Sequence, residues 1–298
     1  MPSIPQGTIV VTGATGYLGS HLCRILSRYG YRVLALARNR QSAARLVRFA
    51  PHTEVVLVKR PSEISDFLNS AQVDGLVHLA SPNSATDGHN VEPEIVELAR
   101  TIAGSVLNSS LRFVVSAGTW WQWNDLGEEV PLNDYANGKS MQQLLIEEAV
   151  SQANKNSITV IPNDIYGPVD WRSKLINHLL ASALSGGTGK ALKLTDGTQQ
   201  INLIHVEDAA TGIFRVIERC MNAYEAPIAT YRLCGQDTLS IREIVATFEK
   251  LGHRPNVFFD DLGKPFGGRM NPNVPVPPVP GWQSKYRFEA FLQQELTK

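Results

Sequence analysis

The sequence predicts an α/β protein: a Rossmann-type, doubly wound parallel sheet with a smaller C-terminal α/β domain for the substrate. Three observations predict this fold class. A short β-branched run near the N-terminus leads into a glycine-rich turn, strand-like apolar runs then alternate with segments of helical length, and this alternation stops after residue 168. Strands separated by helices of about ten or more residues need right-handed crossovers, which place the strands parallel in one sheet.

The turn that follows the first strand, residues 9–11, carries Gly13, Gly16 and Gly19. Gly13 lets the chain turn tightly, Gly16 removes the Cβ that would keep a pyrophosphate from the backbone, and Gly19 lets the next helix pack on the strand. The N-terminus of that helix offers free N–H groups and a partial positive charge to an anion. We therefore expect a dinucleotide cofactor here. Its further contacts in this turn are expected to be Thr15, Tyr17 and Leu18.

The later elements follow in order. Strands are expected at residues 32–37, 55–58, 75–79, 113–116 and 158–161, and helices at 19–29, 92–106 and 135–153. After residue 168 we expect a helix at 174–185, a glycine-rich loop at 185–189, a strand at 203–206, a helix to about residue 221 and an extended proline-rich arm at 271–280. Residues 1–165, with about 200–235 returning to them, are assigned to the dinucleotide-binding domain. Residues 166–199 and 236–298 are assigned to the substrate-binding domain.

The composition excludes several functional classes. The 298 residues are 43% hydrophobic and 19% charged, as in a soluble globular protein, and 28 basic residues balance 28 acidic ones. No net field draws nucleic acid or an anionic membrane. Cys23, Cys220 and Cys234 lack metal-ligand or redox spacing, so we expect buried thiols and no metal. Without a signal segment or a membrane-length apolar run, the expected location is the cytoplasm.

Tyr135 and Lys139 lie four residues apart in a segment expected to be helical, so they share one face. A free tyrosine has a pKa of about 10 and is a poor acid or base at neutral pH. A neighbouring ammonium favours the phenolate, and lowering the pKa by roughly three units takes about 4 kcal/mol of differential interaction. The pair is therefore a candidate acid/base couple. Taken alone, it fits an exposed Tyr and Lys on a surface helix better.

Several motifs occur in a characteristic order: the glycine turn, His78-Leu79-Ala80-Ser81 after the fourth strand, the Tyr135/Lys139 pair, and Tyr166-Gly167-Pro168. In this order they resemble the extended short-chain dehydrogenase/reductases, and more narrowly the nucleotide-sugar epimerases, dehydratases and reductases. The resemblance continues to residues 281–283 and covers nearly the whole chain. It implies an NAD(P)-dependent oxidoreductase and a homodimer formed through helices 92–106 and 135–153. The further cofactor contacts that it implies are Leu79, Ala80, Ser81, Lys139 and Pro162.

The resemblance also implies a Ser or Thr that hydrogen-bonds the reacting oxygen, here Ser116 or Thr119. The run Gly-Thr-Trp-Trp-Gln at 118–122 is similar to the variant in nucleotide-deoxysugar 4-reductases, which favours Thr119. Trp120 and Trp121 are expected to wall a sugar or base pocket, and the alternative is that they fill the core. The other candidate substrate contacts are Asp164, Arg172, Lys174 and Arg269, and for Arg172 and Lys174 a solvated helix start is an equally good interpretation.

Three features depart from the family pattern, one of which is that residues 58–62 lack the acidic residue that often follows the third strand and meets adenine. Gly138 replaces the usual hydroxyl residue before the catalytic Lys, and Asp164 replaces the Asn that in many relatives contacts the substrate diphosphate. These departures concern substrate and activity rather than fold.

The candidate reactions differ in the acid/base groups that they need. Dehydration needs a second couple, an Asp-Glu pair after the catalytic Thr in the 4,6-dehydratases, whereas Trp120 and Trp121 follow Thr119 here. Epimerisation at C3 and C5 uses a Cys/His pair, and no cysteine lies between residues 23 and 220. We therefore expect reduction of the C4 carbonyl of a nucleotide-linked 4-keto-6-deoxy sugar. The alternatives are a 4-epimerase with retained NAD and a catalytically silent member that senses NADP(H).

The end of the second strand bears on the choice of cofactor. An Asp or Glu there binds the ribose 2′-OH of NAD and repels a 2′-phosphate. Ala37, 24 residues after Gly13, stands in that place, and Arg38 follows it, with Arg40 as a second candidate contact. Since a guanidinium binds phosphate in a charge-assisted fork, we predict NADP(H) over NAD(H). The alternative is that Arg38 stacks on adenine and that either cofactor is accepted.

Overall fold

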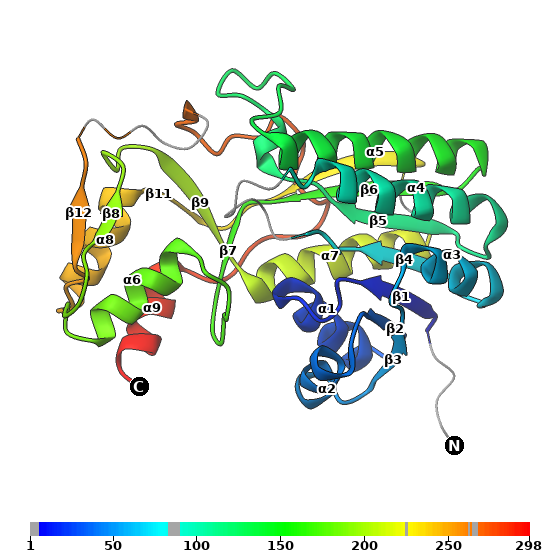
Figure 1. The fold of residues 1–298 in the computed structure, drawn as a ribbon, viewed down its shortest axis with the longest axis horizontal. Coiled ribbons are helices and arrows are strands. Elements are labelled where there is room, and N and C mark those ends of the chain that lie inside the picture. The colour runs from blue at the N-terminus through cyan, green and yellow to red at the C-terminus, as the bar shows by residue number, and fades with distance from the viewer. Residues whose placement is uncertain (1–5, 83–89, 224–225, 262, 264–267) are drawn as a thin grey trace.

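The computed structural model describes residues 6–82, 90–223, 226–261, 263 and 268–298. These residues form a large sheet with helices on both faces and, beside it, a smaller lobe with two short sheets (Figure 1). The strands of the large sheet are β1 (Thr8–Thr12), β2 (Arg32–Ala37), β3 (Thr53–Leu57), β4 (Gly75–His78), β5 (Phe113–Ala117), β6 (Asn156–Pro162) and β10 (Ile228–Leu233).

The large sheet has the strand order β10-β6-β5-β4-β1-β2-β3, and every neighbouring pair runs parallel. The predicted fold class, a doubly wound parallel sheet of Rossmann type with a smaller α/β part, is confirmed. The β-branched run in β1 explains the centre of this sheet, because Ile9, Val10 and Val11 are fully buried between two layers of helices.

Helices cover both faces of the sheet (Figure 1). The hydrophobic cluster on one face includes side chains of α3 (Pro61–Ser70), α4 (Glu92–Asn108) and α5 (Asp134–Gln152). The cluster on the other face includes side chains of α1 (Tyr17–Arg28), α2 (Arg40–Phe49) and α7 (Val206–Met221). The apolar pattern did not predict α2 and α3. Each buries only two side chains, Ala43 and Leu46 in α2 and Ile64 and Leu68 in α3, so the helical periodicity is short.

The smaller lobe has its own core, which includes Tyr166, Phe248 and Phe288. Its elements are β7 (Asp164–Tyr166), α6 (Leu175–Leu184), β8 (Leu192–Leu194), β9 (Gln200–His205), β11 (Asp237–Ser240), α8 (Ile241–Lys250), β12 (Val257–Phe259) and α9 (Phe288–Leu296). One sheet has the order β11-β9-β7 and the other pairs β12 with β8. Of the segment 200–235, α7 and β10 pack with the large sheet, whereas β9 pairs within the smaller lobe. The division into two domains remains a prediction.

The proline-rich segment 271–280 contains no helix and runs beside β10, where Arg232 N donates to Pro277 O at 2.9 Å. It is the extended arm that its five prolines predict. Cys23 and Cys220 are buried and Cys234 is half-buried, and all three thiols are free. Within the described ranges, no helix combines the length and the apolar character that crossing a membrane requires.

Candidate active site

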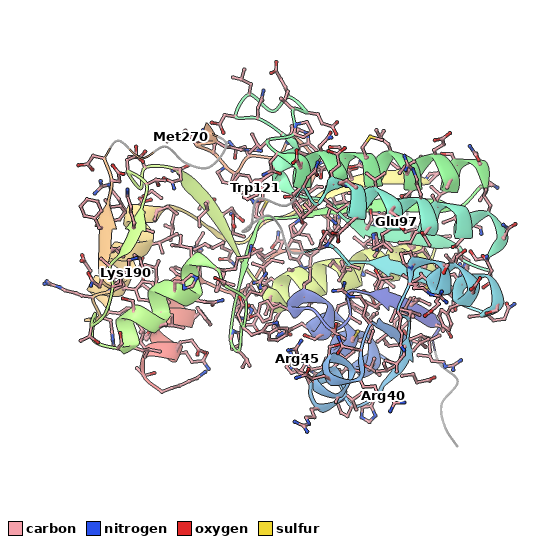
Figure 2. All side chains as sticks on the ribbon, in the orientation of Figure 1. Arg40, Arg45, Glu97, Trp121, Lys190 and Met270 are labelled. Carbon is pink, nitrogen blue, oxygen red and sulfur yellow. The ribbon has the colours of Figure 1, made fainter. Side chains whose placement is uncertain are left out.

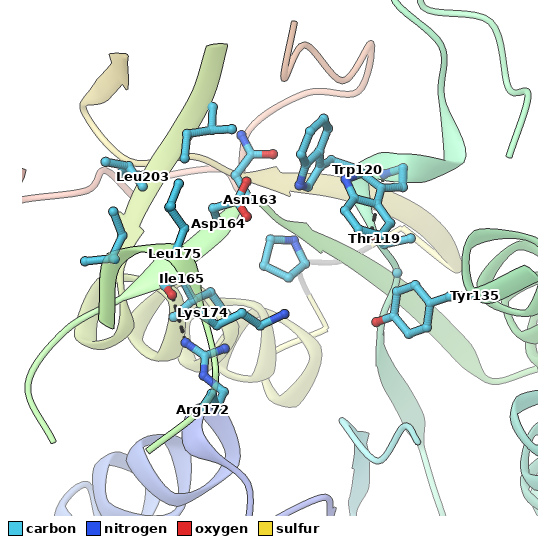
Figure 3. A pocket seen from close by; sticks show the side chains of 15 residues that line it. Thr119, Trp120, Tyr135, Asn163, Asp164, Ile165, Arg172, Lys174, Leu175 and Leu203 are labelled. Carbon is cyan, nitrogen blue, oxygen red and sulfur yellow. Dashed lines mark hydrogen bonds between the residues drawn. The ribbon is translucent and has the colours of Figure 1, made fainter. Parts of the chain in front are cut away.

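A cavity of about 200 Å³ lies where the carboxyl edge of the large sheet meets the smaller lobe. Figure 3 shows its lining, with Thr119 and Trp120 on one side, Tyr135 beside them, and Asp164 and Lys174 across from them. The sequence-predicted residues that line it are Thr119, Trp120, Trp121, Tyr135, Pro162, Asp164, Arg172 and Lys174. Ser116, Lys139 and Arg269 do not line it. Trp121 lies between the large sheet and the smaller lobe (Figure 2).

Tyr135 is in the first turn of α5, which begins where the Asn133 side chain accepts a hydrogen bond from Ala136 N at 2.9 Å. Its ring meets that of Trp121 edge-on, with ring centroids 6.5 Å apart. Burial raises the pKa of the Tyr135 phenol above its usual value of 10.0, and the Ser81 hydroxyl acts in the opposite direction. The phenol is therefore protonated at neutral pH and is a candidate proton donor in the cavity.

Lys139 lies one helical turn after Tyr135, and its Nζ is 5.9 Å from the centroid of the Tyr135 ring. The side chain is 1% exposed, and burial lowers the pKa of Lys139 to about 7. Its Nζ donates to Gln142 Oε1 at 3.1 Å, and Gln142 Nε2 donates to Ala117 O at 3.2 Å. Since no carboxylate is bonded to Lys139 in the described part of the chain, a neutral amide acceptor holds the ammonium.

His78 borders Lys139 from the end of β4. Its Nδ1 shares a 2.7 Å hydrogen bond with Thr12 Oγ1. Burial, reinforced by the Lys139 charge, lowers the pKa of His78 to about 3, so the imidazole is neutral near pH 7. His78 thus adds no second charge beside Lys139.

Thr119 and Ser116 lie in different environments. Thr119 is the N-cap of the short 3₁₀ helix η1 (Trp120–Gln122), where its Oγ1 accepts from Trp121 N at 3.4 Å. It lines the cavity together with Tyr135. Ser116 is fully buried in β5, and its Oγ is 3.2 Å from Thr159 Oγ1 of β6. The fold therefore brings Thr119, and not Ser116, to the cavity.

The two basic residues after β7 differ in their partners. Arg172 makes a bidentate ion pair with Asp170, at 2.8 and 2.7 Å, and donates to Ile165 O at 2.8 Å. Its guanidinium also lies over the Tyr17 ring, 4.5 Å from the centroid. Lys174 instead extends across the cavity toward Tyr135 (Figure 3). Arg172 is therefore largely occupied within the protein, whereas Lys174 presents its ammonium to the cavity.

Arg269 is buried behind the tryptophans rather than in the cavity wall. Its guanidinium lies over the Trp120 ring, 4.8 Å from the centroid. It donates to four backbone carbonyls, those of Trp120, Trp123, Asn271 and Asn273. Arg269 therefore joins the tryptophan loop to the proline-rich arm.

The glycine turn packs closely against its neighbours. Gly13 has φ +70°, and a Cβ there would lie 2.6 Å from Ala80 N. A Cβ on Gly19 would lie 2.2 Å from Gly13 O, so the helix packs closely on the turn. Among the described residues, a Cβ on Gly16 would approach only Gly13 O, at 3.1 Å. The first turn of α1 carries no acidic side chain, so no carboxylate of this turn would repel an anion.

The end of β2 has a buried alanine followed by exposed arginines. Ala37 is 2% exposed, and Arg38 and Arg40 are exposed beside it. Arg40 and Arg45 lie on α2 (Figure 2). Arg45 donates to Thr15 O at 3.5 Å, so α2 brings a further cation to the glycine turn.

The sequence model of the NAD dependent epimerase/dehydratase family matches residues 9–228. The chain belongs to this family. Its glycine turn and its Tyr135/Lys139 helix thus lie in an NAD-dependent oxidoreductase of the extended short-chain dehydrogenase/reductase type.

Two relatives of this chain are named as reductases. One is a ceramide reductase of Caulobacter vibrioides, 28% identical over 214 residues, which are 70% of this chain and 61% of that one. Another is a dTDP-4-dehydro-6-deoxy-D-allose reductase of a Streptomyces species, 24% identical over 302 residues, which are 90% of this chain and 85% of that one. The solved structure of MoeE5 with UDP-glucuronic acid and NAD superposes with a TM-score of 0.81 at 18% identity and covers 98% of both chains. This last likeness confirms the fold.

Some residues of the candidate site were not predicted from the sequence. Gln142 was not predicted, although its spacing of three residues from Lys139 puts both on one helical face. The apolar part of the cavity wall was also missed. It includes Leu175 and Ile176 at the start of α6, and Ile201 and Leu203, which alternate along β9.

Proposed function

We propose that this protein uses NAD(P)H to reduce the C4 carbonyl of a nucleotide-linked 4-keto-6-deoxy sugar. The observation that carries the proposal is that Tyr135 and Thr119 open onto the same cavity, with Trp120 and Trp121 beside Thr119. Indole side chains transfer no protons, so the position next to Thr119 supplies no acid/base couple for elimination. The name of the Streptomyces relative, a 4-dehydro-6-deoxysugar reductase, is consistent with this chemistry.

In the proposed reaction the carbonyl carbon gains a hydride and the carbonyl oxygen gains a proton. A nicotinamide cofactor whose pyrophosphate is held at the glycine turn would supply the hydride. Tyr135 gives its phenolic proton to the oxygen, and the hydroxyl of Thr119 donates a hydrogen bond to the same oxygen as negative charge develops there. Lys139, as an ammonium, favours the phenolate that Tyr135 becomes and contacts the nicotinamide ribose. Ser81, Leu79, Ala80 and Pro162 complete the proposed cofactor contacts.

The proposed cofactor is NADP(H), because the exposed Arg38 follows a buried Ala37 in place of an acidic residue. The proposed assembly is a homodimer through α4 and α5. On α5, Leu144 is 60% exposed, which is consistent with a partner on this face. A cytoplasmic location remains a prediction.

The deciding experiment incubates the purified protein with NADPH and dTDP-, CDP- and UDP-linked 4-keto-6-deoxyhexoses. We expect one equivalent of NADPH to be oxidised per equivalent of 4-hydroxy product, followed by absorbance at 340 nm and by mass spectrometry. Interconversion of 4-hydroxy epimers without net NADPH consumption would instead identify a 4-epimerase. If the protein binds the cofactor but neither reduces nor epimerises any sugar of the panel, it is a sensor.

A further inference from the structure

Asp164 is the first residue of β7 and lines the cavity at the entrance to the smaller lobe. Its Oδ2 is buried and has no hydrogen-bond partner in the part of the chain that the structure describes. An unpaired carboxylate oxygen away from water is costly, so native proteins rarely leave one unsatisfied. Because this oxygen borders a cavity, a bound molecule can satisfy it.

The groups around Asp164 show what kind of molecule fits. Burial raises the pKa of its carboxyl to about 6, while Lys174, Arg172 and a hydrogen bond from the Trp120 side chain oppose this rise. The group is therefore mainly an anion at pH 7. Arg172 is already paired with Asp170, which leaves Lys174 as the cation presented to the cavity among the described lining residues.

A carboxylate on this wall attracts hydrogen-bond donors and repels anions. A phosphate or carboxylate of a ligand would face the negative charge of Asp164, whereas an ammonium would face Lys174. A hydroxyl group carries no charge and donates the hydrogen bond that Oδ2 lacks. Ile165, Leu175 and Leu203 line the same part of the cavity and lower its polarity, which strengthens such a bond.

We propose that Asp164 determines substrate specificity in this cavity: its Oδ2 accepts a hydrogen bond from a substrate hydroxyl, and its charge excludes phosphate and carboxylate groups from this wall. The inference rests on the proposed function in one respect, that the cavity holds the sugar. It adds that the sugar retains a hydroxyl that reaches Asp164 Oδ2 and that the diphosphate lies away from Asp164.

The first test uses inorganic pyrophosphate and the protein saturated with NADP⁺, so that the glycine turn is filled. Binding is followed by the intrinsic tryptophan fluorescence, to which Trp120 and Trp121 in the cavity wall contribute. We expect Asp164→Asn to bind pyrophosphate about tenfold or more tightly than the wild type, because the repelling charge is gone while Lys174 remains. The double variant Asp164→Asn/Lys174→Gln should lose this gain, and Asp66→Asn, the same change on an exposed helix, should match the wild type. Equal binding by wild type and Asp164→Asn would overturn the proposal.

The second test compares kcat/KM for a dTDP-linked 4-keto-6-deoxyhexose and for analogues that each lack one ring hydroxyl. The wild type should lose about tenfold or more on one analogue, since a site built to bond a hydroxyl discriminates against its absence. Asp164→Asn should show a similar loss on the parent sugar and little further loss on that analogue. Additive losses from the two changes would contradict the assignment. If the wild type reduces no nucleotide-linked ketone, the proposed function fails, and the pyrophosphate result still decides the role of Asp164.

Discussion

Lys139 Nζ donates to Gln142 Oε1 at 3.1 Å, and the other end of the same amide is fixed by its 3.2 Å bond to Ala117 O. A lysine side chain that is 1% exposed is thus held by a neutral partner that is anchored to β5. A neutral acceptor stabilises an ammonium less than a carboxylate would, which is consistent with a Lys139 pKa of about 7. We infer that Gln142 is a positioning residue that sets the charge and the place of Lys139.

Substitution of Gln142 should therefore move the pH dependence of turnover. Lys139 is charged below its pKa and neutral above it, so activity that needs the ammonium falls as the pH rises through about 7. Gln142→Leu removes the acceptor, lowers the pKa of Lys139 further and should move the basic limb of the kcat profile to lower pH. Gln142→Glu supplies a carboxylate and should move it to higher pH.

The neighbouring Gln143 offers a matched control. Its Nε2 bonds Glu147 and Thr230 rather than Lys139. Gln143→Leu should leave the basic limb where it is in the wild type. Unchanged profiles in both Gln142 variants, with native circular dichroism, would remove Gln142 from any positioning role.

Tyr135→Phe should separate binding from chemistry. The substitution removes only the phenolic hydroxyl, so NADPH binding and the melting temperature should stay close to those of the wild type. General acid catalysis typically contributes about 10²–10⁴-fold, and kcat should fall by this amount. Stopped-flow turnover and NADPH fluorescence titration measure the two quantities. Near-normal turnover on the true substrate would exclude Tyr135 as the proton donor.

The choice between Thr119 and Ser116 can be made with three variants. Thr119→Val should reduce kcat by about 10²–10³-fold, as loss of one donor to a developing oxyanion does in other enzymes. Thr119→Ser keeps the hydroxyl and should recover most of the activity. Ser116→Ala leaves the cavity unchanged, because Ser116 is bonded to Thr159 inside the sheet, and kcat should stay within about threefold. The reverse ranking of these variants would assign the reacting oxygen to Ser116.

The parallel, doubly wound character of the large sheet could be predicted because most of its strands are short apolar runs separated by segments long enough for crossovers, whereas β10 was not predicted. Residues at strand ends could be predicted as site residues for the same reason: Thr119 follows β5 and Asp164 follows β6, and parallel strands end at one edge. Tyr135 and Thr119 do line one cavity. The helices α2 and α3 could not be predicted from apolar periodicity, because two buried side chains in each leave too short a pattern.

The roles of the arginines depend on contacts that spacing does not reveal. Arg172 has a planar fork suited to a diphosphate, and Asp170, two residues earlier, already occupies it. Arg269 is buried against a tryptophan loop almost 150 residues away in sequence, a contact that only the folded arm creates. Sequence spacing thus located the candidate site but not the charges that remain available within it.

Arg269 leads to a prediction about stability. Arg269→Met keeps much of the side-chain volume but removes the donors to four carbonyls and the cation over Trp120. The free energy of unfolding should fall by about 2–4 kcal/mol, as measured by urea denaturation. Arg48→Met, on the exposed face of α2, should change it by less than about 0.5 kcal/mol. Equal effects of the two substitutions would show that Arg269 does not join the two segments.

The last prediction concerns the cofactor. Arg38 is exposed directly after β2, where an acidic residue would bind a ribose 2′-OH, so its guanidinium is available to a 2′-phosphate. Hydrogen bonds to charged groups contribute about 1.5–3 kcal/mol, which corresponds to roughly 10–150-fold in affinity. Arg38→Ala should therefore lower the ratio of kcat/KM for NADPH to that for NADH by about this factor, chiefly through KM for NADPH. Ala37→Asp should act in the same direction by repelling the phosphate.

The matched control is Arg48→Met, which removes a cation from the other end of α2 and should leave the NADPH/NADH ratio unchanged. The cofactor choice also bears on the reaction, because an epimerase must retain its NAD, whereas a net reductase benefits from an exchangeable NADPH. Equal use of NADH and NADPH by the wild type, or an unchanged ratio in Arg38→Ala, would therefore count against the reductase as well as against NADP(H). A ratio that falls in Arg38→Ala and holds in Arg48→Met would assign the 2′-phosphate to Arg38.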